Sequence, residues 1–269
     1  MAENPAAEVR LEKVSYRYPG SERSERPVIA ELSLELPRGV MTLVGPNGSG
    51  KSTLLLLAAG ILLPTSGTVF LRGIDTRSLR EEHERQRHVS FVYQNMEFET
   101  EEPIGALLEY VYANGFHEPG DVDLIPELIE VCELSALLGK KTQEVSKGEL
   151  QRTIIAFSLL YGSRILMLDE PIFALEERQK HRIMAFLVEY TRTRGISLYY
   201  SVHELDISWK YSDTLLLFYK SGRLRMGSTD ALFSRTNIEE AYQVPYVMLK
   251  HKESLYRETL DRKIDKYGL

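Results

Sequence analysis

The sequence is poor in two features that would each point to a particular class of protein. It has one cysteine, Cys132, in 269 residues, so no disulfide forms within the chain and a reducing, cytosolic compartment is expected. Its longest apolar run, Leu54 to Leu63, is about half a membrane-spanning helix. The polar, acidic stretch from Met1 to Arg10 is also unlike a secretion signal. We therefore expect any membrane contact to go through a partner protein.

Positive charge is also in short supply. The 33 Lys and Arg residues are outnumbered by 39 Asp and Glu residues, for a formal net charge of −6. General nucleic-acid binding needs a surplus of basic side chains that neutralise phosphates. We therefore expect no nucleic-acid partner, whereas 43% hydrophobic residues are ample for a folded core.

Short apolar runs alternate with helical patterns along most of the chain. The runs are typical of strands, and several are separated by helix-forming segments, which predicts an α/β fold with a largely parallel sheet. They are centred on Val9 to Tyr16, Leu32 to Leu36, Val40 to Val44, Thr68 to Leu71, Val89 to Tyr93, Ile165 to Leu168, Ile196 to Val202 and Thr214 to Tyr219. A charged surface loop is expected from Pro19 to Arg26.

The pattern becomes mainly helical between Asn95 and Ser146. Its apolar stripe consists of Leu124, Ile125, Leu128, Ile129, Cys132 and Leu137. We interpret the chain as one domain in which residues 1–94 and 150–228 form the α/β core. Residues 95–149 form a helical insertion, and residues 229–269 form a helical appendage at the C-terminus.

One segment carries a strong signal for nucleotide binding. Gly45-Pro46-Asn47-Gly48-Ser49-Gly50-Lys51-Ser52 satisfies the phosphate-loop, or Walker A, pattern between a predicted strand and a predicted helix. The glycines let backbone N–H groups face one anion at the positive end of the helix. Lys51 then reaches the β- and γ-phosphates of ATP, Ser52 coordinates Mg²⁺, and Thr53 helps to hold the α-phosphate.

Two adjacent carboxylates, Asp169 and Glu170, follow the apolar run that starts at Ile165. Ligands bind at this end of parallel strands, and neighbouring side chains in a strand point to opposite sides. We therefore expect Asp169 to serve Mg²⁺ and Glu170 to act as a general base. An Asp-Glu pair alone is weak evidence, but together with the phosphate loop it is hard to dismiss.

A third segment, Val145-Ser146-Lys147-Gly148-Glu149-Leu150-Gln151-Arg152, resembles the signature motif of the ABC ATPases. The resemblance extends from Val9 to Ser228 and includes Gln94, Pro171 and His203, each after a predicted strand. It implies a phosphate-loop (RecA-like) ATPase core with an N-terminal antiparallel β region and an inserted helical subdomain. It also implies a head-to-tail dimer in which the phosphate loop of one subunit and the signature of the other enclose each ATP.

The resemblance assigns roles to several residues outside the phosphate loop. Ser146 and Gly148 of the signature are expected to contact the γ-phosphate across the dimer, and His203 within the subunit. Gln94 is expected to link Mg²⁺ to the helical insertion. Tyr18 is expected to stack on the adenine, with Tyr16 as its competitor for that role.

The signature departs from the usual Leu-Ser-Gly-Gly-Gln of the family at two positions. Lys147 replaces the first glycine, where its charge could favour the γ-phosphate, and Glu149 replaces the glutamine. We expect Glu149 to fold back and cap its helix instead of facing the nucleotide. Glu176, where the family commonly has Asp, is a third departure. Together these changes leave open a nucleotide-binding regulatory subunit of low activity that depends on a paralogous partner.

The absence of fused membrane helices favours an importer whose ATPase is a separate chain. The tail from Ala231 to Leu249 resembles those of importers for iron chelates or cobalamin and of energy-coupling-factor importers. We therefore expect an ATPase, peripheral at the cytoplasmic face of the cell membrane, that powers import of a metal chelate, metal ion or vitamin. Its partners would be permease subunits bound through the helical insertion, an identical or paralogous ATPase subunit and, indirectly, a solute-binding protein.

Overall fold

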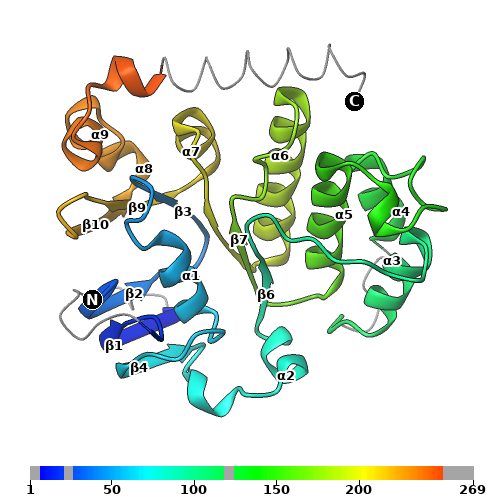
Figure 1. Cartoon of the computed structure of the whole chain (residues 1–269), viewed down its shortest axis with the longest axis horizontal. Helices are drawn as coiled ribbons and strands as arrows, with labels where there is room; N and C mark the ends of the chain where they lie inside the picture. Colours follow the sequence, from blue (N-terminus) through cyan, green and yellow to red (C-terminus); the bar gives the residue numbers. More distant parts are fainter. Residues whose placement is uncertain (1–6, 21–26, 118–123, 251–269) are drawn as a thin grey trace.

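The computed structural model describes residues 7–20, 27–117 and 124–250, which form two sheets with helices around them (Figure 1). The smaller sheet is antiparallel, in the order β2 (Ile29–Leu36), β1 (Val9–Tyr16), β4 (Ser66–Leu71) and β5 (Ile74–Asp75). The larger sheet has the order β10 (Leu224–Ser228), β9 (Thr214–Phe218), β3 (Val40–Val44), β8 (Ser197–Ser201), β7 (Ile165–Asp169) and β6 (Val89–Val92).

The larger sheet is parallel except for its edge strand β10. Every residue of β3, β7 and β8 is buried, which explains why these strands are continuous apolar runs and not alternating patterns. Because the strands are parallel, the segments that follow β3, β6, β7 and β8 all emerge where the strands end, at the carboxyl edge of the sheet. That edge carries the candidate site.

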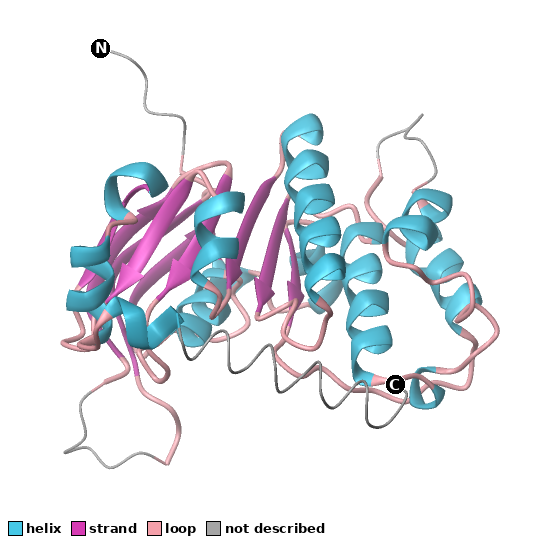
Figure 2. Ribbon diagram, turned by 90° about the horizontal axis from the view of Figure 1, so that it is seen from above, coloured by secondary structure: helices cyan, strands magenta, loops and turns pink. Residues whose placement is uncertain are grey.

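Helices cover both faces of the larger sheet, as the view from above shows (Figure 2). α1 (Lys51–Ala58) packs between the smaller sheet and one face, while α5 (Lys147–Leu160) and α6 (Glu177–Arg194) cover the other. The remaining helices are α2 (Glu82–Gln86), α3 (Ile104–Ala113), α4 (Ile125–Val131), α7 (Leu205–Tyr211), α8 (Thr229–Leu232) and α9 (Arg235–Tyr242), with 3₁₀ turns at Thr76–Ser78 and Thr142–Glu144. None of the described helices is long and apolar enough to cross a membrane.

The predicted α/β fold is confirmed, and each predicted strand is present with its ends shifted by a few residues at most. The strands β5 and β10 and the short helix α2 were not predicted. β10 is an edge strand with no fully buried residue, so it lacks the apolar run that marks the inner strands. Parts of two predictions, the loop at 21–26 and the appendage at 251–269, lie outside the described residues.

The predicted apolar stripe of the helical insertion packs against α5. Leu124, Leu128 and Cys132 are at most 3% exposed, and α3 and α4 both contact α5. Burial of the Cys132 thiol raises its pKa to about 12. Since the thiolate is the reactive form of cysteine, this side chain should be inert in the folded protein.

We predict that a thiol-specific dye at pH 8 labels the folded chain negligibly and labels one thiol after denaturation. A matched control is the double variant Cys132→Ser/Ser135→Cys, because Ser135 lies on the exposed side of the same segment. That variant should react while folded. Rapid labelling of the folded wild-type chain would show that the α4–α5 contact opens readily.

Candidate active site

The segment between β3 and α1 makes a tight glycine turn at the N-terminus of the helix. Gly48 and Gly50 have φ angles of 73° and 98°, a conformation that residues with side chains rarely adopt. A Cβ atom on Gly45 would lie 2.6 Å from the carbonyl oxygen of Phe218. Glycine at these positions therefore permits the turn that a phosphate cradle requires.

The Lys51 side chain crosses this turn. Its ammonium donates hydrogen bonds to the carbonyl oxygens of Gly45, at 2.8 Å, and of Pro46, at 3.1 Å. Burial lowers the pKa of Lys51, although the negative charges of Glu170 and Asp169 raise it in part. The phosphates of a nucleotide in the turn would add negative charge beside the ammonium and favour its charged form.

Of the two candidate tyrosines, Tyr18 is the one that reaches the phosphate loop. Its hydroxyl lies 3.0 Å from the Thr53 hydroxyl in the first turn of α1, and its side chain is 44% exposed. Tyr16 is buried in the smaller sheet, and its ring meets that of Tyr18 edge-on. An exposed ring face is needed for stacking on a base, so the geometry favours Tyr18 over Tyr16.

Asp169 ends β7, Glu170 follows it, and the two carboxylates have different partners. Asp169 accepts a hydrogen bond from the hydroxyl of Ser201 on the neighbouring strand β8. Glu170 has a φ angle of 52°, which is unusual for a residue with a side chain, and its N–H donates to the Ser201 carbonyl oxygen at 3.1 Å. Ser201 therefore holds both residues where the chain turns sharply away from the strand.

The Glu170 carboxylate is the meeting point of three loops. Gln94, after β6, donates from Nε2 to Oε2 of Glu170 at 2.7 Å, and Nε2 of His203, after β8, lies 2.6 Å from Oε1. The sequence predicted each of these residues separately as part of one site. The structure brings all three into direct contact at the carboxyl edge of the sheet.

The signature segment begins α5. Ser146 is the N-cap, its hydroxyl accepts from the Glu149 N–H, and the Glu149 carboxylate accepts from the Ser146 N–H at 2.7 Å. The predicted cap is thus confirmed. Burial raises the pKa of Glu149, but the hydrogen bonds from Ser146 and the positive charges of Lys140 and Arg152 together leave the pKa below its ordinary value. The Lys147 ammonium lies 3.1 Å from a carboxylate oxygen of Glu97, and both side chains are exposed.

Two contacts that support the site were not predicted. One is Ser201, whose only signal in the sequence is a small polar residue at the end of an apolar strand. The other is Gln151 of α5, whose side-chain amide contacts the backbone of Glu170 and Ala174. Both depend on which loops and strands become neighbours in space.

An ion pair between buried Lys180 and half-buried Glu204, also unpredicted, lies next to His203 in the chain. Lys180 of α6 is 2% exposed, and its ammonium is 2.6 Å from the carboxylate of Glu204, which follows His203 and precedes α7. The pair ties the segment that carries His203 to the long helix α6. Such a buried contact fixes geometry even where it adds little net stability.

No cluster of three or more His, Cys, Asp or Glu side chains that could hold a metal ion by itself occurs among the described residues. Mg²⁺ in nucleotide sites usually relies on one or two protein oxygens plus phosphates and water. The predicted ligands fit this pattern, since Ser52 lies in the first turn of α1 and Asp169 ends β7 on the same edge of the sheet. Gln94 would contribute its amide oxygen, because its nitrogen contacts Glu170.

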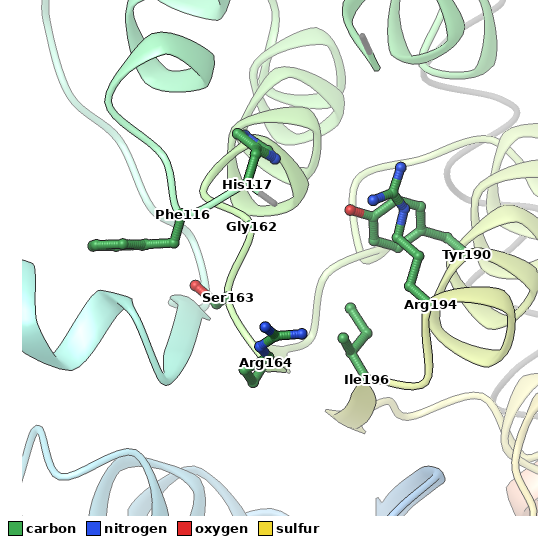
Figure 3. Close-up of a pocket in the computed structure, with 8 residues that line it drawn as sticks. All are labelled: Phe116, His117, Gly162, Ser163, Arg164, Tyr190, Arg194 and Ile196. Carbon is green, nitrogen blue, oxygen red and sulfur yellow. The ribbon is translucent and has the colours of Figure 1, made fainter. Parts of the chain in front are cut away.

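The structure has two cavities of note, and the larger one is not at this site. A cavity of about 100 Å³ lies beside the site, between the segment after Gln94 and α5, and includes Tyr93, Met96 and Phe173 in its lining. The larger cavity, of about 180 Å³, lies near the opposite edge of the sheet, before β7 and β8 (Figure 3). Its Arg164 and Arg194 come from segments that carry none of the predicted site residues.

Comparison with known proteins agrees with this geometry. A family model described as ABC transporter matches residues 29–173. The chain is 32% identical over 239 residues to a putative ABC transporter ATP-binding protein of Archaeoglobus fulgidus, covering 87% of this chain and 96% of that protein. It is 30% identical over 220 residues to the phosphonates import ATP-binding protein PhnC 2 of a Synechococcus species, covering 77% and 80%.

Solved structures show the same fold. A dimeric ATP-binding cassette in a post-hydrolysis state, with ADP and phosphate bound, has a TM-score of 0.69 at 24% identity and covers 82% of this chain and 98% of its own. An ATP-binding subunit of an ABC transporter has a TM-score of 0.71 at 20% identity, covering 91% and 98%. The chain therefore belongs to the ABC transporter family. Within that family it is an ATP-hydrolysing subunit.

We predict that Glu149→Gln changes ATP turnover by no more than about threefold, because an amide oxygen can still accept the Ser146 N–H bond that caps α5. Ser146→Arg should abolish dimer-dependent turnover, since it removes the cap and puts a long cation at the helix N-terminus. Both are measured as Mg-ATPase activity in the assembled complex. A large gain from Glu149→Gln would mean that the native carboxylate opposes the nucleotide.

We predict that Lys180→Met lowers the free energy of unfolding by about 2 kcal/mol, because the half-buried Glu204 carboxylate loses its ammonium partner. The double variant Lys180→Met/Glu204→Leu should regain most of that loss. Urea denaturation of the wild type and the three variants of this cycle gives the coupling energy. A single-variant effect below about 0.5 kcal/mol, typical of surface pairs, would contradict a structural role.

Proposed function

We propose that this chain powers a separately encoded membrane importer of a metal chelate, metal ion or vitamin by hydrolysing Mg-ATP. The observation that carries the proposal is the Glu170 carboxylate, held between Gln94 and His203 on the same sheet edge as the phosphate loop. Relatives that are import ATP-binding proteins support the direction of transport. Their names give phosphonates, Fe³⁺ ions, sulfate or thiosulfate, and HMP or thiamine, so they support import without agreeing on a substrate.

In the proposed reaction, the phosphate loop binds the nucleotide and Tyr18 stacks on its adenine. Ser52, Asp169 and Gln94 would hold Mg²⁺, which neutralises phosphate charge when bound. Glu170 takes a proton from the attacking water, while Lys51 and His203 stabilise charge on the γ-phosphate. Most of the acceleration then comes from positioning and charge and needs no covalent intermediate.

The proposed partners follow from the site. A second ATPase subunit, identical or paralogous, would supply Ser146 and Gly148 of its signature to the γ-phosphate. Permease subunits would dock on the helical insertion, beside which Tyr93, Met96 and Phe173 are exposed around the smaller cavity. A solute-binding protein would act through the permease, and the chain would work at the inner face of the cell membrane.

A regulatory subunit of low activity is the second candidate, and the altered signature is the observation that favours it. The cap formed by Glu149 weakens that case, because the carboxylate is engaged with its own helix and the N-terminus of α5 is intact. Lys51, Asp169, Glu170 and His203, the residues expected to perform hydrolysis, are all present. We therefore place the active ATPase first.

We predict that Glu170→Gln still binds ATP and accumulates as the closed dimer, while losing nearly all turnover, because only the proton acceptor is removed. The measurement is Mg-ATPase activity of the chain alone and with its permease in lipid, and size-exclusion chromatography with ATP reports the dimer. Glu189→Gln, on the exposed side of α6, is the matched control and should leave turnover unchanged. Permease-stimulated turnover in Glu170→Gln would refute the assignment of the base, and ATP binding without turnover by the wild type in either setting would favour the regulatory subunit.

A further inference from the structure

Gln151 joins the signature helix to the catalytic loop through one side chain. Its Nε2 donates to the carbonyl oxygen of Glu170 at 3.0 Å, and its Oε1 accepts from the N–H of Ala174 at 2.9 Å. The residue lies one turn beyond Ser146 on α5. A single amide therefore connects the helix that begins with the signature serine to the backbone of the residue assigned as the general base.

The two backbone groups that Gln151 contacts, the Glu170 carbonyl and the Ala174 N–H, have the spacing of a helical hydrogen bond. A carbonyl and an N–H four residues apart bond directly in one turn of an α-helix. Here the Gln151 amide binds both, while the Glu170 carbonyl also accepts from the N–H of Phe173 at 3.4 Å. The side chain thus fixes the spacing between the two ends of the loop. Removing it takes the Gln151 bond from the Ala174 N–H and leaves the Glu170 carbonyl with the longer bond from Phe173.

This bridge lies where Glu170 has its unusual backbone conformation. A φ angle of 52° costs free energy in a residue with a side chain and persists only where surrounding contacts hold it. Ser201 holds the N–H of Glu170, and Gln151 holds its carbonyl. A shift of Gln151 would therefore be transmitted to the Glu170 peptide and to the direction of its carboxylate.

A second observation shows that the start of α5 is tightly fitted to the same loop. A Cβ atom on Gly148 would lie 2.8 Å from the carbonyl oxygen of Ala174, a distance that no real contact shows. The loop and the signature helix thus touch backbone to backbone at this position. Because Gly148 packs against the residue that Gln151 binds, the first turn of α5 and the loop are expected to move together.

We propose that Gln151 is a positioning residue that couples the two nucleotide sites of the dimer. This inference relies on the proposed head-to-tail dimer, in which Ser146 faces the ATP of the partner subunit while Glu170 serves the ATP of its own. Engagement of α5 by the γ-phosphate at one site then sets the backbone of Glu170 at the other site. Loss of the bridge should leave ATP binding intact and make the two sites independent.

The test compares three variants in the permease complex with MgATP as the probe. Gln151→Met keeps the length and the helix preference of the side chain and removes both hydrogen bonds. Gln151→Glu keeps an acceptor for Ala174 and loses the donor to Glu170. Gln86→Met is the matched control, since Gln86 is only half-buried on α2 and its side-chain amide contacts Glu82 of the same helix.

With both bonds removed, we expect kcat to fall by about ten- to a hundredfold, as for a misplaced catalytic group, while KM for ATP stays within about twofold. The Hill coefficient for ATP should be greater than about 1 in the wild type and fall to about 1 in this variant. Gln151→Glu should behave similarly, and Gln86→Met should match the wild type. An unchanged kcat, or a lower kcat with an unchanged Hill coefficient, would overturn the coupling. A lower melting temperature together with lost ATP binding would also overturn it, by showing that Gln151 only supports the fold.

A second readout needs no turnover and separates this inference from the proposed function. In the Glu170→Gln background, hydrogen exchange of residues 170–176 is followed with MgATP, with and without Gln151→Met. We expect the ATP-induced protection of this loop to be lost in the double variant while the dimer persists. Full protection in the double variant would overturn the coupling, whereas a wild-type complex without ATP hydrolysis would instead contradict the proposed function.

Discussion

The rest of the site depends on how one residue, Glu170, is held. Its N–H is bound by Ser201, its carbonyl by Gln151, and its two carboxylate oxygens by Gln94 and His203. These contacts come from β8, α5 and the segments after β6 and β8. A left-handed conformation at a glutamate is unfavourable on its own, so it persists because independent elements determine it. Any change in the packing of these elements is therefore felt at the carboxylate.

The parallel sheet makes this convergence possible. The four strands that precede the site motifs, β3, β6, β7 and β8, all end at one edge, so motifs separated by over a hundred residues in the chain meet there. The sequence allowed the strands β3, β6, β7 and β8 to be predicted because each contains a short run of apolar residues. Given that pattern, the placement of Lys51, Gln94, Glu170 and His203 on one edge follows from topology alone.

The contacts that could not be predicted are those between elements whose relative position has no local signal. Ser201 and Gln151 are ordinary polar residues in sequence, and their roles appear only once β8 is beside β7 and α5 is against the loop after β7. Lys180 and Glu204 are 24 residues apart and form a partly buried pair because α6 packs beside the segment after β8. The edge strand β10 was missed for a related reason, since its exposed side chains lack the apolar pattern that burial imposes.

The altered signature illustrates how helix capping can preserve a function while residue types change. A glutamine at position 149 would offer an amide, whereas Glu149 offers a carboxylate that satisfies the Ser146 N–H and also places negative charge in the first turn of α5, where the helix dipole favours it. That charge would oppose a phosphate only if it faced the nucleotide. Because the carboxylate accepts from the Ser146 N–H that it caps, it is engaged with its own helix. The ammonium of Lys147, by contrast, is exposed beside Glu97. Of the two charges that the altered signature adds at this helix N-terminus, it is the one that can turn toward a phosphate, and its positive sign is favourable.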